Sequence, residues 1–108
     1  MEHTQTLAEL LREDISPDFP VSKGTGGADD PLVITESIDY VAVEYAVIRH
    51  VMSMLGEDWE KGGQRLYGKE DRIMDEIVVN AKKAGAPEWQ HRRRFHFDIT
   101  IGFRNLGT

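Results

Sequence analysis

One stretch limits the possible folds more than any other: residues 37–56 read SIDYVAVEYAVIRHVMSMLG, a long apolar run. Its β-branched residues would also suit a strand, but the run is too long for one strand and its polar residues do not alternate. Ser37 can cap the start of a helix and Gly56 can end one. We therefore expect a core helix with apolar residues Ile38, Val41, Val43, Tyr45, Val47, Ile48, Val51, Met52, Met54 and Leu55.

Two further stretches have helical patterns. Thr6 and Glu9 form a capping-box pattern at the start of a short amphipathic segment. In residues 69–84 the apolar side chains recur at three- and four-residue steps, and Gly85 and Pro87 follow as helix stops. The sequence therefore predicts a second long helix over residues 69–84, packed against the core helix.

The end of the chain has the alternation of a β-strand. Residues 93–103 place apolar side chains at every second position, and residues 32–35 form a short β-prone segment. Helices must cover the aromatic face of such a strand. We therefore expect one α+β domain over residues 1–108, with two layers and with helices packed on one face of a small, mainly antiparallel sheet.

This predicted sheet lacks strands, because one long strand and one short segment cannot satisfy a ladder of hydrogen bonds. A long apolar edge also invites association. We therefore expect a second subunit to complete the sheet in a homodimer. Charge favours antiparallel pairing of the two final strands centred on Phe97, which sets His96 opposite Asp98 of the partner subunit.

Two segments are expected to be irregular. Residues 15–31 contain three prolines and a glycine cluster, which indicates a long surface loop. Lys23 beside these glycines could hold a phosphate, but no Walker motif is present and Asp29 and Asp30 would repel an anion. Residues 57–68 include a Gly-Gly pair, so we expect a connection that folds onto the core.

Charge and composition narrow the class of protein. Cysteine is absent, which excludes a disulfide framework and a thiol nucleophile. The net charge of −6 argues against duplex nucleic acid or an anionic membrane as the main partner. Residues 1–60 carry 13 acidic and 3 basic side chains and residues 61–108 carry 6 and 10, so the halves attract each other. With no signal-peptide pattern and no membrane-spanning run, we expect a soluble cytoplasmic protein.

The final predicted strand carries the first candidate site. His96 and Asp98 project from one face, where a base lies beside a carboxylate that could orient it. Such a pair suits a small hydrolase-like enzyme, although it is also common on a solvated strand face. A metal site would need His91, His50 or Glu44 as further ligands, and no short ligand motif is present. We expect no metal and no cofactor.

The second candidate site overlaps the start of that strand. An aromatic ring and a basic run lie together there, which suits a phosphate, a carboxylate or single-stranded nucleic acid. The alternative is that the run neutralises the acidic half of the chain. The residues of this site are Trp89, Arg92, Arg93 and Arg94. Inside the core helix, Glu44 also needs a partner, and we expect Arg72 or an arginine of the final strand.

Three functions stay open on the sequence. The missing strands and the lack of a convincing site favour a non-catalytic homo-oligomeric interaction or accessory protein. The first alternative is a module that binds a small anionic ligand through Trp89, Arg92 and Arg94. The second is a hydrolase-like enzyme that uses His96 and Asp98. Dinucleotide, nucleophile-elbow and helix-turn-helix signatures are missing.

Overall fold

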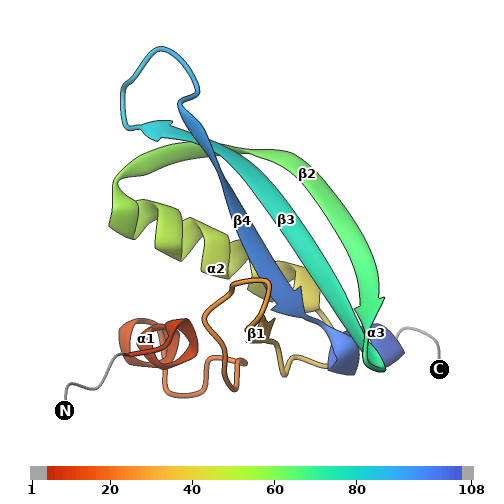
Figure 1. Cartoon of the computed structure of the whole chain (residues 1–108). Helices are drawn as coiled ribbons and strands as arrows, with labels where there is room; N and C mark the ends of the chain where they lie inside the picture. The colour runs from red at the N-terminus through yellow and green to blue at the C-terminus, as the bar shows by residue number, and fades with distance from the viewer. Residues whose placement is uncertain (1–4, 106–108) are drawn as a thin grey trace.

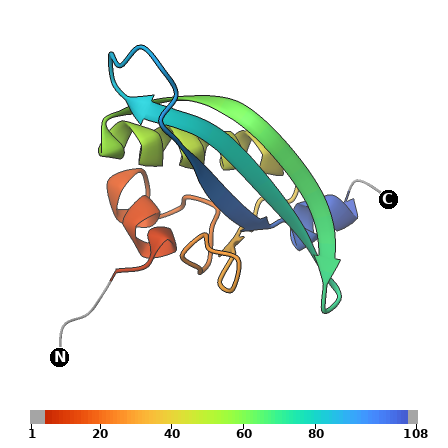
Figure 2. The ribbon, with the colours of Figure 1, turned by 45° about the horizontal axis from the view of Figure 1, so that its top comes forward.

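The apolar run forms helix α2, and a four-stranded sheet lies over it in the computed structural model, which describes residues 5–105 (Figure 1). The described elements are α1 (Leu7–Asp14), β1 (Leu32–Val33), α2 (Tyr40–Leu55), β2 (Glu57–Lys69), β3 (Arg72–Lys83), β4 (His91–Asp98) and α3 (Thr100–Asn105). The long strands β2 and β3 curve across α2 (Figure 2). The expected α+β class is confirmed.

Both the short first helix and the core helix form as predicted. The Thr6 hydroxyl accepts from the backbone N–H of Glu9 at 3.2 Å, and the Glu9 carboxylate accepts from the backbone N–H of Thr6 at 3.3 Å, which caps α1. Helix α2 begins after Asp39 rather than Ser37, because the Asp39 carboxylate accepts a first-turn backbone N–H at 3.1 Å. Gly56 ends α2 in the left-handed region, with φ of 68°.

The helix predicted for residues 69–84 is wrong, because β3 occupies this segment and pairs antiparallel with β2. Four residues make two periods of a strand, so Ile73, Ile77 and Ala81 share a face in a strand as they would in a helix. The turn before β3 has positive φ at Glu70 (52°) and Asp71 (64°), the backbone of a two-residue hairpin. The apolar spacing therefore fitted both a helix and a strand, and pairing with β2 in the hairpin makes this segment a strand.

The irregular connection predicted for residues 57–68 is also wrong. Strand β2 spans this segment, and Gly62 is an extra residue between two strand pairs, which makes a bulge rather than an interruption. Trp59 points toward α2, and its ring stacks on Tyr45 with 6.5 Å between centroids. The Gly-Gly pair thus bends a strand and does not end it.

The final strand is shorter than the alternation predicted. Strand β4 ends at Asp98, and α3 follows, so Ile101 and Phe103 belong to a helix. The Asp98 carboxylate accepts from the backbone N–H of Thr100 at 3.0 Å and from its hydroxyl at 2.6 Å. These two bonds turn the chain out of the sheet and satisfy donors at the start of α3.

The strand order is β1-β4-β3-β2, and only β1 and β4 run parallel. Phe97 lies opposite Leu32 on one side and Asp75 on the other. The homodimer register centred on Phe97 is therefore wrong, because the chain itself already occupies both sides of that residue. The homodimer as such stays a prediction.

The core lies where α2 meets the inner face of the sheet. Its cluster of buried residues includes Val43, Val47, Ile48 and Met52 of α2 with Ile77, Val79, Phe95 and Phe97 of the sheet. Leu11 and Leu32 extend the same cluster toward α1 and β1. Within residues 5–105, no helix combines the length and the apolar character needed to cross a membrane.

Candidate functional site

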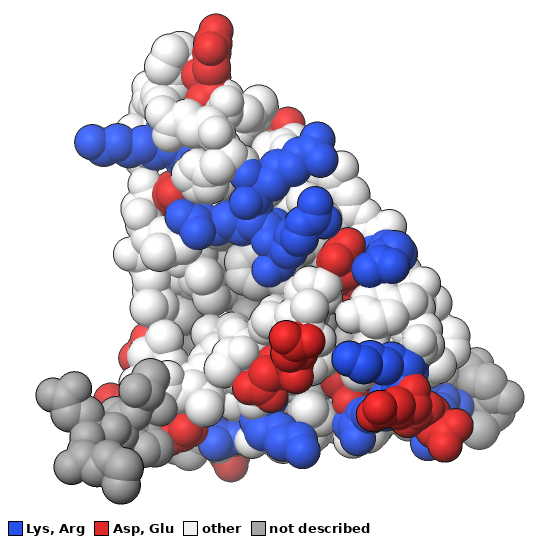
Figure 3. Space-filling view, viewed as in Figure 1, with Lys and Arg blue, Asp and Glu red and all other residues white. Residues whose placement is uncertain are grey.

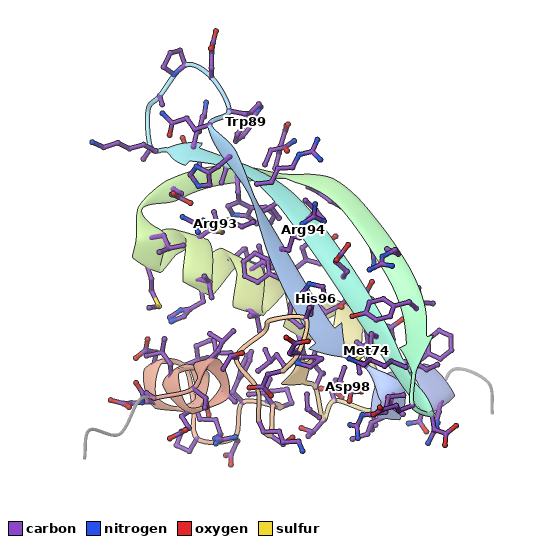
Figure 4. All side chains as sticks on the ribbon, in the orientation of Figure 1. Met74, Trp89, Arg93, Arg94, His96 and Asp98 are labelled. Carbon is purple, nitrogen blue, oxygen red and sulfur yellow. The ribbon has the colours of Figure 1, made fainter. Side chains whose placement is uncertain are left out.

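Successive side chains of β4 point to opposite faces of the sheet. Its two phenylalanines point into the core, so the alternate residues point to the other face, which we call the open face. In β4 the residues of the open face are Arg92, Arg94, His96 and Asp98, and Figure 4 shows Arg94, His96 and Asp98 in line along the strand. The glycine-containing loop borders this face, because the backbone N–H of His96 donates to the Gly26 carbonyl at 2.9 Å.

Arg65, Glu76 and His96 form a row across three strands of the open face, since each lies opposite the next in the strand register. The Glu76 carboxylate is 3.6 Å from the guanidinium of Arg65, 3.5 Å from that of Arg94 and 3.5 Å from Nε2 of His96. The side chain of Glu76 is 11% exposed, whereas those of Arg65 and Arg94 are 63% and 56% exposed. One nearly buried carboxylate therefore lies among two solvent-facing arginines and a buried imidazole.

His96 and Asp98 share the open face, but each has its own partners. Nδ1 of His96 is 3.3 Å from the hydroxyl of Tyr67, and Nε2 faces Glu76. The Asp98 carboxylate accepts from the guanidinium of Arg72 and from Thr100. No hydrogen bond joins His96 to Asp98 among the described residues, and their catalytic role stays a prediction.

The basic run divides between the two faces of the sheet. Arg92 and Arg94 lie on the open face, whereas Arg93 points to the inner face and donates two hydrogen bonds to Glu57, at 2.6 and 3.0 Å. Hydrogen bonds from Arg93, and less so from His91, outweigh burial and lower the pKa of Glu57 to about 2. Arg93 therefore has a structural partner.

Arg72 on the open face pairs with Asp98. Three other arginines of this face, Arg65, Arg92 and Arg94, form what we call the arginine patch. In the described part of the chain, Arg92 has no carboxylate within ion-pair distance, and Arg65 and Arg94 have only the longer contacts to Glu76. Figure 3 shows the basic side chains gathered over the upper part of β3 and β4. Trp89 lies in the adjoining loop with Lys82 Nζ 4.9 Å from its ring centroid, so a further cation and an aromatic ring border the patch.

A cavity of about 230 Å³ lies beyond the other end of β4. Lys23, Asp29 and Asp30 of the glycine-containing loop line one side, Lys69 and Arg72 of the hairpin line another, and Asp98 also contributes. Acidic and basic side chains are thus mixed here. The phosphate site considered at Lys23 gains no support from this arrangement, since four acidic residues line the same space: Asp29, Asp30, Glu70 and Asp98.

Glu44 and Asp75 form a second cluster, which is enclosed between α2 and β3. Both residues are buried, with exposed fractions of 0% and 1%. The neighbour of Glu44 is Asp75, so the expected pairing with Arg72 or an arginine of the final strand is wrong. Neither Glu44 nor Asp75 lines the cavity. No group of three or more His, Asp or Glu side chains within residues 5–105 is arranged to hold a metal ion.

Sequence reasoning missed three residues of the open face: Arg65, Tyr67 and Glu76. They lie on β2 and β3, and neither segment was expected to be a strand. Alternation was present in both, since Arg65 and Tyr67 are two apart, as are Met74, Glu76 and Val78.

Comparison with known proteins found no matching family model, no matching curated protein and no matching solved structure.

Proposed function

We propose that this chain is a non-catalytic binding domain that receives a phosphate or carboxylate group on the arginine patch. The observation that carries this proposal is the arrangement of Arg65, Arg92 and Arg94 on one face with Glu76 as the carboxylate among them. Guanidinium groups have planar, paired donors that match phosphate and carboxylate oxygens. Trp89 and Lys82 offer a neighbouring surface for an unsaturated or cyclic part of the ligand.

The two other functions have less support. The homo-oligomeric interaction was favoured because the final strand lacked neighbours, and β1 and β3 supply neighbours within the chain. The hydrolase needs His96 beside Asp98 as a base and its orienting carboxylate, and their hydrogen bonds run to Tyr67, Arg72 and Thr100 instead. His96 is better placed as a member of the anion-binding face.

Inorganic phosphate is the simplest probe of this proposal. A ligand at about ten times its dissociation constant adds about 1.4 kcal/mol to the free energy of unfolding. We expect phosphate to raise the melting temperature of the wild type, and the double variant Arg92→Ala/Arg94→Ala to lose this rise. Both arginines have solvent-facing side chains, so the variant should melt near the wild type when phosphate is left out.

The matched control is the double variant Arg49→Ala/Lys83→Ala, which removes two exposed cations outside the patch. It should retain the full phosphate effect, and added sodium chloride should weaken the effect in the wild type because exposed charges are screened. An equal phosphate-induced rise in both double variants would contradict the proposal, since phosphate would then act on the general charge of the protein.

A further inference from the structure

Glu76 lies at the centre of the arginine patch, but it does not satisfy the arginines. Its distances of 3.6 Å to Arg65 and 3.5 Å to Arg94 exceed those of ordinary N–H···O hydrogen bonds, about 2.7 to 3.2 Å. The guanidinium donors therefore keep hydrogen-bonding capacity for another acceptor. An anion that reaches the patch meets a negative charge already among the cations, and must compete with it.

His96 is the titratable group next to that charge, and charged or polar groups face it from every neighbouring strand. Arg65 and Tyr67 face it from β2, Glu76 from β3, and Arg94 and Asp98 flank it along β4. On the loop side, its backbone N–H donates to the carbonyl of Gly26.

The imidazole can hold one or two protons in this place without rearrangement. When it is neutral, Nδ1 can accept from the Tyr67 hydroxyl at 3.3 Å, while the protonated Nε2 faces the Glu76 carboxylate at 3.5 Å. When it is protonated, both nitrogens donate, and the Tyr67 hydroxyl turns to accept. Histidine is the side-chain type that ordinarily changes its charge between about pH 5 and pH 8.

We infer that Glu76 is the built-in counter-ion of the arginine patch and that His96 takes up a proton when an anion binds. This inference rests on the proposed function. Counted alone, the three arginines of the patch and Glu76 carry a charge of 3 − 1 = +2, and a protonated His96 raises this sum to +3. By linkage, a proton that tightens anion binding is itself bound more tightly when the anion is present.

Sulfate is the suitable probe, because it does not titrate over the pH range in question. One added charge a few ångströms away in a partly solvated site should make sulfate binding about threefold to tenfold tighter at about pH 5.5 than at about pH 8. Isothermal titration calorimetry near neutral pH, in two buffers with different heats of ionisation, should also show proton uptake on sulfate binding. This measurement uses the wild type and needs no variant to fold.

Two variants separate the parts of the inference. Glu76→Gln removes the competing charge and should bind sulfate severalfold more tightly at about pH 8, whereas weaker or equal binding would overturn the role of Glu76 as counter-ion. His96→Gln should abolish both proton uptake and the pH dependence. His50→Gln is the matched control: His50 lies on α2 against Asp14, and its loss should leave both effects in place.

The possible failures are distinguishable. Wild-type sulfate binding of equal strength at both pH values, without proton uptake, would overturn the inference and leave the proposed function standing. Proton uptake that persists in His96→Gln would also overturn it, because the proton would then reside elsewhere. Absence of sulfate binding at both pH values would overturn the proposed function and this inference together.

Discussion

Glu44 and Asp75 bring two carboxyl groups together in the core, where neither can be solvated. Both oxygens of Glu44 and Oδ1 of Asp75 lack a donor among the protein groups around them, while Gln64 donates to Oδ2 of Asp75 at 2.8 Å. A proton on Glu44 resolves this, because its carboxyl O–H can then donate to Asp75. Burial first and Asp75 second raise the pKa of Glu44 to about 10.

The pH dependence of stability tests this assignment. Because the pKa of Glu44 is higher in the folded state than in the unfolded chain, the stability from its protonated form is complete below about pH 4.5 and declines up to about pH 10. Glu44→Gln keeps a donor toward Asp75 and cannot ionise. We expect its free energy of unfolding to gain on the wild type with rising pH, by at most about 1.4 kcal/mol per pH unit.

Urea unfolding at several pH values between neutral and mildly alkaline measures this difference. Glu88→Gln, an equivalent change at an exposed loop position, should follow the wild-type curve at every pH. Parallel curves for the wild type and Glu44→Gln would show that Glu44 does not carry the buried proton.

At the scale of elements, the sequence was informative where local chemistry decides the structure. Caps at Thr6 and Gly56 identified the two longer helices, and strict alternation identified β4 from Arg93 to its end at Asp98. The hairpin of β2 and β3 was missed, because Ile73, Ile77 and Ala81 fit a helix and a strand equally well. Only pairing between strands separates these possibilities, and pairing depends on contacts that a local pattern does not contain.

The residues of the open face could be predicted only where the strand that carries them was recognised. Arg92, Arg94 and His96 could be placed together from the alternation of one strand. Arg65 and Glu76 could not be added, since their strands were not recognised. The partner of Glu44 was missed for the same reason: Asp75 faces it only because β3 is a strand.

The loop before β1 contains a backbone position at Gly24 that a residue with a Cβ cannot occupy without a clash. Gly24 has φ of 111°, and a Cβ there would lie 2.0 Å from the carbonyl oxygen of Pro31. Its own carbonyl accepts from the backbone N–H of Ala8 at 3.2 Å and so joins the loop to α1. Gly24→Ala should therefore lower the free energy of unfolding by about 1 to 3 kcal/mol.

Denaturant unfolding provides the measurement for Gly24→Ala. Gly27→Ala is the control in the same loop. A Cβ at Gly27 would lie 3.7 Å from the Thr25 hydroxyl oxygen, which is an ordinary contact, and the φ of Gly27 is not positive. The control should change stability little. Equal losses for the two variants would mean that the loop is sensitive to any added side chain rather than to the backbone of Gly24.

Across the whole molecule, few ion pairs within residues 5–105 join the acidic first part of the chain to its basic second part. Among ion pairs of the described residues, those of Glu57 with His91 and Arg93 join residues 1–60 to residues 61–108. The other cations of the second part pair with its own carboxylates or face solvent. Neutralisation of the acidic half therefore accounts for Arg93 but not for Arg92 or Arg94, which supports an external anion as their partner.

The sheet also has one long free edge, and this determines where the predicted homodimer would form. In the described residues β2 pairs only with β3, so its outer edge stays unpaired over a strand of 13 residues. The other edge strand of the sheet is β1, which pairs with the last residues of β4, Phe97 and Asp98. Long unpaired edges favour association with another strand. We therefore predict that a second copy pairs with β2 rather than with β4.

The charges along β2 specify the direction of this pairing. Its start carries Glu57, Asp58 and Glu60, and its later part carries Lys61, Arg65 and Lys69, so antiparallel strands set the acidic start of one copy near the basic end of the other. Sedimentation at micromolar concentrations should show a dimer that weakens in high salt. Lys69→Glu should weaken it further by placing like charges together, whereas Lys83→Glu, the same change on β3, should not. A wild type that sediments as a monomer throughout, or equal weakening by the two variants, would contradict pairing through β2.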